Sequence, residues 1–429
     1  MQISTRPITI LGFARLAIYG IFLNYYSFYI LRGSFIPYGT PIFYGVAIAC
    51  VLATIFQEKV SFSNEIICWI VYTVLSLVTA VFAINMQTAF DGIGEFIRRT
   101  VLIMMIAYIC EKDGSVKFAI RVLAVTAVAC AASCLIMNTD ISKKLELESG
   151  ASVSTNDIGS IMAFGCFAVL FAFGLKQHKG IIKTAIKIGY IIAAVSVVFI
   201  AGSRKSILAI LILFGLIFLL CGRDFLKNIS LLQFVLVLLL IVGAVIFVYY
   251  YLLPNVESTN MYIRIWGRNA EDTAESDQGR LDLYSQALQE FGDHIICGMG
   301  FNNFSVTHGN YTHSTYVEPL ACSGIIGFLY LAPYVMILVK QIKLIRLYRD
   351  NIEERIWQKE LLAFYISFLF VGIGIPYIYK DIPCIILGMF IASQKISFDK
   401  LKEKSTEQVA EGVIHEPVPN ESIATFSRF

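Results

Sequence analysis

The residues most able to do chemistry lie at the ends of apolar stretches. Arg204 and Lys205 occupy the turn 202–206, Gly-Ser-Arg-Lys-Ser, which separates two such stretches. Gly202 can end one helix and Ser203 can cap the next. The N–H groups of a first helical turn favour an anion, and a guanidinium binds phosphate oxygens in pairs. The turn therefore predicts an anion-binding site, with extension of these cations to lipid headgroups as the alternative.

A second group of candidates surrounds His313, in the segment 311–316 that precedes another apolar stretch. A histidine at a water–lipid boundary can be neutral at working pH and can accept a proton. His313 is therefore a candidate general base, and an interfacial histidine that only forms hydrogen bonds is the alternative. Glu318 lies just inside the apolar stretch, where a carboxyl group is costly and often functional. It can orient a partner or pair with an arginine.

The composition requires that most of the chain lie in an apolar solvent. Hydrophobic residues make up 57% of the 429 residues, charged residues only 15%, and mean hydropathy is +0.71. A soluble domain carries about 25% charged residues. The net charge of +3 gives no argument for nucleic acid as a partner. Most of the ten cysteines lie in apolar segments, no Cys/His spacing predicts zinc, and we expect no metal and no cofactor.

Twelve apolar stretches predict an all-α polytopic membrane protein with about twelve transmembrane helices, since a span needs about 20 apolar residues. The predicted spans are 8–31, 41–56, 65–84, 96–110, 116–138, 157–175, 181–201, 205–221, 230–253, 316–339, 360–379 and 381–396. The last pair is bracketed by Pro376 and Pro383 and can also be one broken helix.

The distribution of lysine and arginine predicts the orientation. Basic residues gather in 340–359 and at the start of the tail, and with twelve spans these segments fall on the side of the N-terminus. Cytoplasmic loops carry the excess of positive charge, so both termini are predicted to be cytoplasmic. The long loop 254–315, between spans nine and ten, then lies outside the cytoplasm. We expect a transmembrane domain over 1–397 and a cytoplasmic, disordered tail over 398–429.

Several further arginines fall on the predicted outer side, where short loops disfavour cations. Arg98 and Arg99 lie at the start of span four, and the outer loop carries Arg264, Arg268 and Arg280. Each can serve a specific site or extend to headgroups. Part of the outer loop predicts an amphipathic helix from apolar residues spaced three and four apart, ended by two glycines. These residues are Leu281, Tyr284, Leu288 and Phe291, followed by Gly298 and Gly300.

Together, these residues resemble a known family. His313-Ser314, nine further residues and then Gly324-Ile325-Ile326-Gly327 are similar to the signature H-[NSQ]-x9-G-x-x-G of the O-antigen ligase and O-antigen polymerase (Wzy-type) superfamily. As in that family, the motif closes a large outer loop between two late spans. Arg280, which opens the predicted helix, and Gly202-Ser203-Arg204 also resemble family features. The segment Ser154-Thr155-Asn156 is a weaker match.

The resemblance implies a GT-C-like fold and a metal-independent, inverting glycosyltransferase that acts on glycans linked to undecaprenyl diphosphate. Arg204 and Arg280 would stabilise the departing diphosphate, and His313 would take the proton of the acceptor hydroxyl. Substrate-binding roles would fall to Lys205, Asn156, Ser314, Glu318 and Arg264.

The resemblance favours polymerisation of lipid-linked repeats of O-antigen, capsule or exopolysaccharide. Ligation of the same donor to another surface acceptor, and transfer to protein, are close alternatives. A lipid-linked oligosaccharide flippase or other transporter is an alternative of another class, although repeat halves and interrupted helices are not evident. The expected location is the plasma membrane, with membrane lipid and the flippase and chain-length regulator of the same pathway as partners.

The orientation leads to the first prediction. A cysteine introduced into 254–315, in a background lacking Cys297, should react with a membrane-impermeant thiol reagent in intact cells, because this loop is predicted to face outward. A cysteine introduced into 340–359 should react only after lysis and serves as the control. Labelling of the loop only after lysis would reverse the predicted topology.

Overall fold

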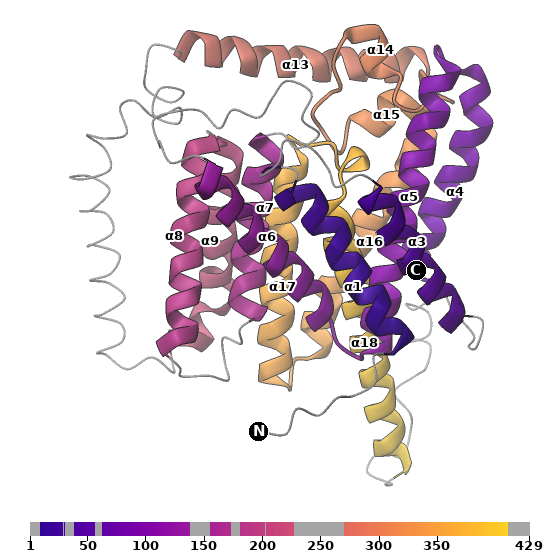
Figure 1. The fold of residues 1–429 in the computed structure, drawn as a ribbon. Coiled ribbons are helices and arrows are strands. Elements are labelled where there is room, and N and C mark those ends of the chain that lie inside the picture. The colour runs from indigo at the N-terminus through magenta and orange to yellow at the C-terminus, as the bar shows by residue number, and fades with distance from the viewer. Residues whose placement is uncertain are drawn as a thin grey trace.

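The computed structural model describes residues 9–28, 30, 38–55, 62–137, 155–172, 181–201, 203–226 and 270–410. Within these ranges the secondary structure is helical, without strands. Most helices run side by side as a bundle, and one long helix lies across an end of that bundle (Figure 1). Predicted span 230–253, the loop segment 254–269 and Arg264 and Arg268 lie outside the described residues.

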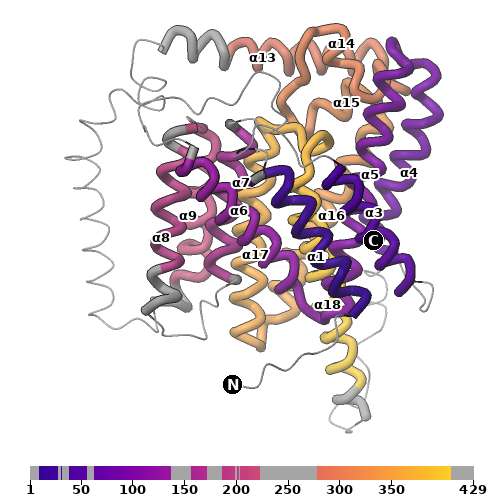
Figure 2. The backbone as a smooth tube through the Cα atoms, viewed as in Figure 1, coloured from indigo at the N-terminus to yellow at the C-terminus, as the bar shows by residue number. Residues whose placement is uncertain are grey.

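The first half of the described chain contributes eight helices, drawn from indigo to magenta in Figure 2. They are α1 (Ile10–Leu23), α3 (Gly39–Ile55), α4 (Asn64–Thr79), α5 (Met86–Lys112), α6 (Lys117–Met137), α7 (Thr155–Ala172), α8 (Ile181–Ala201) and α9 (Arg204–Leu226).

The second half contains the helix across the end of the bundle, two short helices beside it, and three long helices of the bundle (Figure 1). They are α13 (Ala270–Asp293), α14 (Phe304–His308), α15 (Glu318–Ser323), α16 (Gly327–Leu347), α17 (Ile352–Gly372) and α18 (Ile382–Ala410).

Length and composition make five segments of the described chain candidate membrane spans, which supports a polytopic membrane protein. They are Asn64–Phe82, Lys117–Ile136, Arg204–Gly222, Glu318–Leu347 and Ile382–Thr406. Shorter apolar helices cover Gly39–Ile55, Asn156–Phe171 and Ile186–Val198. The count of twelve spans and the sidedness of the loops stay predictions.

Several helix ends differ from the predicted spans because capping side chains, rather than hydropathy, set where a helix begins. The Asn85 side chain accepts the Thr88 N–H at 3.0 Å, so α5 starts ten residues before the predicted 96. Asn351 accepts the Glu354 N–H at 3.2 Å and starts α17 eight residues before the predicted 360. The last two predicted spans are separate helices. α18 continues through the first part of the predicted tail to Ala410, and residues 411–429 lie outside the described part.

Close packing between helices depends on small residues. Gly165 of α7 lies where α6, α7 and α8 meet, and a Cβ at this position would lie 2.4 Å from Cβ of Ala127 and 2.0 Å from the hydroxyl of Tyr190. The Tyr190 hydroxyl donates to the carbonyl of Met162 at 3.3 Å. Helices in a membrane associate through such close approach, because lipid gives no hydrophobic drive between them.

Replacing this glycine should therefore loosen the bundle. Gly165→Ala should lower the stability of the protein in detergent by about 1–3 kcal/mol, the usual cost of overpacking. The matched control is Gly189→Ala on α8, where an added Cβ meets nothing within 4 Å. The midpoint of thermal unfolding, followed by fluorescence-detected size exclusion, should fall for the first variant only. Equal midpoints for the two variants would contradict this account of the packing.

Candidate functional site

His313 lies in the segment 309–317 between α14 and α15, at the same end of the bundle as α13 (Figure 1). Its backbone has a φ of 59°, in the left-handed region that non-glycine residues rarely adopt. Its ring packs against the ring of Tyr311, with centroids 4.3 Å apart. A left-handed backbone at a non-glycine residue is a form of strain that is found most often at functional sites.

The carboxyl group of Glu318 holds this segment in place. Glu318 is fully buried, and it accepts the Thr312 N–H at 2.7 Å and the Tyr379 hydroxyl at 2.8 Å. Thr312 directly precedes His313, and Tyr379 lies in the linker 373–381 that joins α17 and α18. The sequence left open whether Glu318 orients a partner or pairs with an arginine. In the described structure its carboxyl group orients Thr312 and Tyr379.

The residues after His313 attach the same segment to the end of α17. The Thr315 N–H donates to the carbonyl of Gly372 at 2.8 Å, and the Tyr377 N–H donates to the Thr315 hydroxyl at 3.0 Å. Ser314 is buried, and its hydroxyl accepts the Tyr316 N–H at 3.2 Å. In this structure Ser314 shapes the turn, and its predicted contact with substrate stays a prediction.

Three cations from three different elements act electrostatically on the imidazole of His313. They are Lys205 of α9, Arg280 of α13 and Lys380 of the linker. Burial lowers the pKa of His313 most, and the charges of Arg280, Lys205 and Lys380 lower it further, to about 4. The imidazole is therefore neutral near pH 7 and available to accept a proton. Its ring makes no hydrogen bond with the residues that the structure describes.

Two of these cations are fixed by contacts with other helices. The Lys380 ammonium donates to the Asp157 carboxylate of α7 at 2.8 Å. Burial opposes the charge of Lys380, but Asp157 outweighs this and raises the lysine pKa. The Lys205 ammonium donates to the carbonyl of Gly374 in the linker. Both contacts hold positive charge on the side of the linker that faces His313.

Arg280 is positioned by the attachment of α13 to the bundle. One turn after Arg280, the Tyr284 hydroxyl donates to the carbonyl of Ile373 at 2.6 Å. After α13 the chain turns back, and the Met299 N–H donates to the carbonyl of Ala321 at 3.1 Å. A small buried core made of Ala287, Met299, Phe304, Ala321 and Cys322 joins α13 to α14 and α15.

Arg204 is the first residue of α9 and is half-buried, and Ser203 directly precedes the helix as the predicted cap should. The Ser203 hydroxyl bonds to the Ser206 hydroxyl at 2.7 Å, and both are buried against α7. The charge of Lys205, the next residue of this turn, acts on His313. Anion binding by Arg204 stays a prediction, as does substrate binding by Asn156, which precedes Asp157.

Arg98 and Arg99 pair with acidic side chains of the protein in this structure. Both contact the buried carboxylate of Asp381, at 3.0 Å each, and both contact Glu95 one turn earlier. Arg98 also donates to the Tyr44 hydroxyl at 2.8 Å. These contacts anchor the start of α18 to α5.

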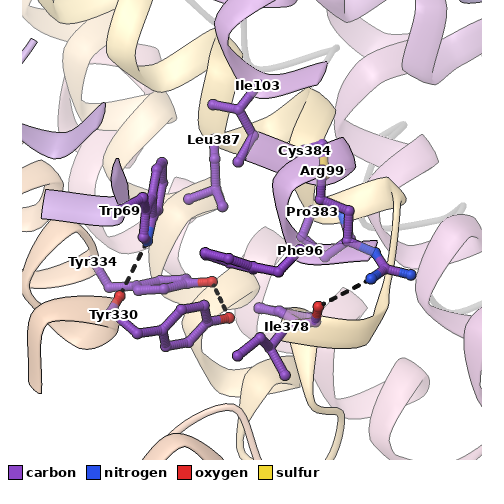
Figure 3. A pocket seen from close by; sticks show the side chains of 11 residues that line it. Trp69, Phe96, Arg99, Ile103, Tyr330, Tyr334, Ile378, Pro383, Cys384 and Leu387 are labelled. Atoms are coloured by element: carbon purple, nitrogen blue, oxygen red, sulfur yellow. Dashed lines mark hydrogen bonds between the residues drawn. The ribbon is translucent and has the colours of Figure 1, made fainter. Parts of the chain in front are cut away.

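Beside this cluster lies a small cavity of about 20 Å³, lined mainly by aromatic and aliphatic side chains (Figure 3). The Trp69 indole donates to the carbonyl of Tyr330 at 3.2 Å, and the hydroxyls of Tyr330 and Tyr334 bond at 2.9 Å. Arg99 points toward the carbonyl of Ile378 at its edge. The cavity has an apolar lining, and the residues that line it include no acid–base pair.

Sequence reasoning did not find Lys380 or its partner Asp157. Lys380 is a cation at the predicted outer end of two spans, so the argument that singled out Arg98 also applied to it. The pairing with Asp157 joins positions 223 residues apart and has no local signal. Tyr311, which packs on His313, was visible only as part of the segment 311–316.

A family model described as O-antigen ligase matches residues 188–332, about a third of the chain. The match includes Lys205, Arg280 and His313. It supports the assignment of this chain to the O-antigen polymerase and ligase superfamily, as its signature predicted, and with it glycan transfer of that general type at a membrane. Comparison with curated proteins gave no match.

The role of Glu318 leads to a prediction about the loop that carries His313. Glu318→Ala should remove the acceptor of the Thr312 N–H and speed its hydrogen exchange at least about fivefold, because leaving a buried donor unsatisfied costs about 1–3 kcal/mol. Tyr379→Phe removes only the second donor and should have a smaller effect. Exchange of peptides covering 309–317 is the measurement, and Glu353→Ala, at an exposed position in the first turn of α17, is the control. Unchanged exchange in Glu318→Ala would mean that this carboxyl does not hold the loop.

Proposed function

We propose that the protein transfers a glycan chain from undecaprenyl diphosphate to a sugar hydroxyl on the extracytoplasmic face of the plasma membrane, polymerising lipid-linked repeats of O-antigen, capsule or exopolysaccharide. The observation that carries this proposal is a neutral, half-buried His313 faced by Arg280, Lys205 and Lys380. A proton acceptor beside several cations suits a reaction that deprotonates a hydroxyl and releases a diphosphate.

In the proposed reaction, the imidazole of His313 takes the proton of the acceptor hydroxyl while that oxygen attacks the anomeric carbon. The bond between this carbon and the diphosphate oxygen breaks, and the diphosphate leaves with the electron pair. Attack from the side opposite to the leaving group inverts the anomeric carbon. Arg280, Lys205 and Lys380, together with Arg204 at the start of α9, stabilise the charge on the leaving group, and no metal ion is needed for this step.

The same cations give the base a dependence on the donor. Burial lowers the pKa of His313 most, and these cations lower it further, to about 4 in the free protein. A bound diphosphate places negative charge among them and offsets their effect on the imidazole, which raises its pKa toward the ordinary value of about 6.5. His313 thus becomes a stronger base once the donor is in place.

Ligation of the glycan to a different surface acceptor is the second candidate, because the matching family model is described as O-antigen ligase. Both reactions use the same donor and the same base. A polymerase acts on the lipid-linked repeats delivered by a flippase, under a chain-length regulator, so these proteins are the proposed partners. A ligase receives a finished chain instead.

Loss of the base gives the main test. In purified protein with lipid-linked repeats and excess chelator, His313→Ala should lower transfer by about 10²–10⁴-fold, the usual contribution of a general base. In cells, polymer should be lost while single lipid-linked repeats build up, because flipping and donor supply do not use His313.

The control is His294→Ala, an exposed histidine on the turn after α13 that contacts Glu290. It should leave transfer near the level of the parent protein. Normal polymer in His313→Ala at an equal protein level would eliminate the base. Loss of polymer without any lipid-linked intermediate on the outer face would favour a transporter.

The cations around His313 predict the acid side of the pH profile. The lowered pKa of His313 keeps its neutral form populated down to about pH 4, so kcat/KM should fall only below that value. Lys380→Met removes a positive neighbour, raises the histidine pKa and should move this limb to higher pH. Lys343→Met, on the opposite end of α16, should leave it in place. If Lys380→Met leaves the acid limb of the profile at the same pH, His313 is not the group whose titration produces that limb.

A further inference from the structure

α13 exposes large apolar side chains along one edge. Leu281 and Leu288 are 58% and 54% exposed, and Ile295 and Ile296, in the turn that follows the helix, are 54% and 70% exposed. Leu281 and Leu288 are seven positions apart within α13 and fall on the same flank of the helix. These four residues are called the apolar edge.

The opposite flank of α13 is polar. At 100° per residue, Gln286 and Asp293 lie across the helix from Leu288, and both are exposed. On this side the Glu290 carboxylate contacts the ring nitrogen Nε2 of His308 in α14 at 3.0 Å. α13 is thus a helix with one face packed on the protein and two free flanks of opposite character.

The apolar edge continues into the outward surface of a candidate membrane span. The Ile325 N–H donates to the carbonyl of Ile295 at 2.8 Å, and the Phe291 ring meets the Phe328 ring edge to face at 6.3 Å. Ile325 and Phe328 are 59% and 52% exposed and belong to the span Glu318–Leu347. Side chains that are both large and exposed on such a span face lipid.

The turn between α4 and α5 reaches the same level from another part of the chain. Its Ile84 N–H donates to the carbonyl of Met299, just after the apolar edge, at 3.2 Å. Phe82, Ile84 and Met86 in and beside this turn are all strongly exposed. Exposed apolar surface therefore extends up the bundle to the layer in which α13 lies (Figure 1).

From this continuity we propose that α13 lies in the outer membrane–water interface, with the apolar edge inserted among lipid acyl chains and the Gln286 flank in water. An amphipathic helix in the plane of the interface buries its apolar side to about 5–10 Å. In this position Arg280, next to Leu281, sits at the depth of lipid phosphates. The last point rests on the proposed function, since it places Arg280 where the donor diphosphate would be.

Tryptophans on the two flanks test the depth of α13. Leu288→Trp and Gln286→Trp are reconstituted in nanodiscs of phosphatidylcholine brominated on its acyl chains, and quenching is measured beyond that of the three native tryptophans. Quenching by bromolipid should be at least about twofold stronger for Leu288→Trp, and quenching by aqueous iodide should be stronger for Gln286→Trp. Leu281→Trp gives an independent second probe if Leu288→Trp does not fold.

Iodide quenching of Leu288→Trp and Leu281→Trp without bromolipid quenching would overturn the proposal. Shielding from both quenchers would overturn it in favour of an interface with a second copy of the chain. These results do not depend on catalysis, so they stand apart from the proposed function. For the Arg280 link, Leu281→Glu with Leu288→Glu should weaken transfer through a higher KM for the donor, and an unchanged KM would remove that link alone.

Discussion

The carboxyl group of Glu318 joins the two segments on which the site depends. It accepts hydrogen bonds from the backbone next to His313 and from the side chain next to Lys380. A buried carboxyl without partners is costly, and in a membrane-spanning segment no water replaces a lost donor. The pairing therefore fixes the loop and the linker relative to each other. Without it, the imidazole and the lysine would be carried on two independent loops.

Lys380 and Asp381 show how neighbouring opposite charges can serve different helices. Lys380 has an extended backbone, so the two side chains point to opposite sides. Lys380 reaches Asp157 of α7, whereas Asp381 reaches Arg98 and Arg99 of α5. The pair does not neutralise itself. Instead the two residues attach the linker to α7 and to α5, and the positive charge of Lys380 still acts on His313.

The sequence predicted the helical membrane architecture well, because apolar length is a property of each segment alone. It also located His313 and the glycines of the signature. The structure shows what each glycine does for the backbone. Gly324 has a φ of 58°, and a Cβ on Gly327 would lie 2.4 Å from the carbonyl of Pro319. Both are needed where the chain turns tightly from α15 into α16.

Features set by contacts between distant helices could not be predicted in this way. The pairing of Arg98 and Arg99 with Asp381, and of Lys380 with Asp157, arises only when the bundle closes. For the same reason, the sequence could not show that the charge of Lys205 acts on His313.

The left-handed backbone of His313 sets stability against activity at a single position. An L-residue with a side chain costs about 1–2 kcal/mol in this conformation, whereas glycine adopts it without penalty. Selection for a more stable protein would therefore replace this histidine with glycine and remove the proposed base. With histidine at this position the loop is less stable than it would be with glycine. A search for thermostable variants that does not also screen for activity would therefore favour inactive ones.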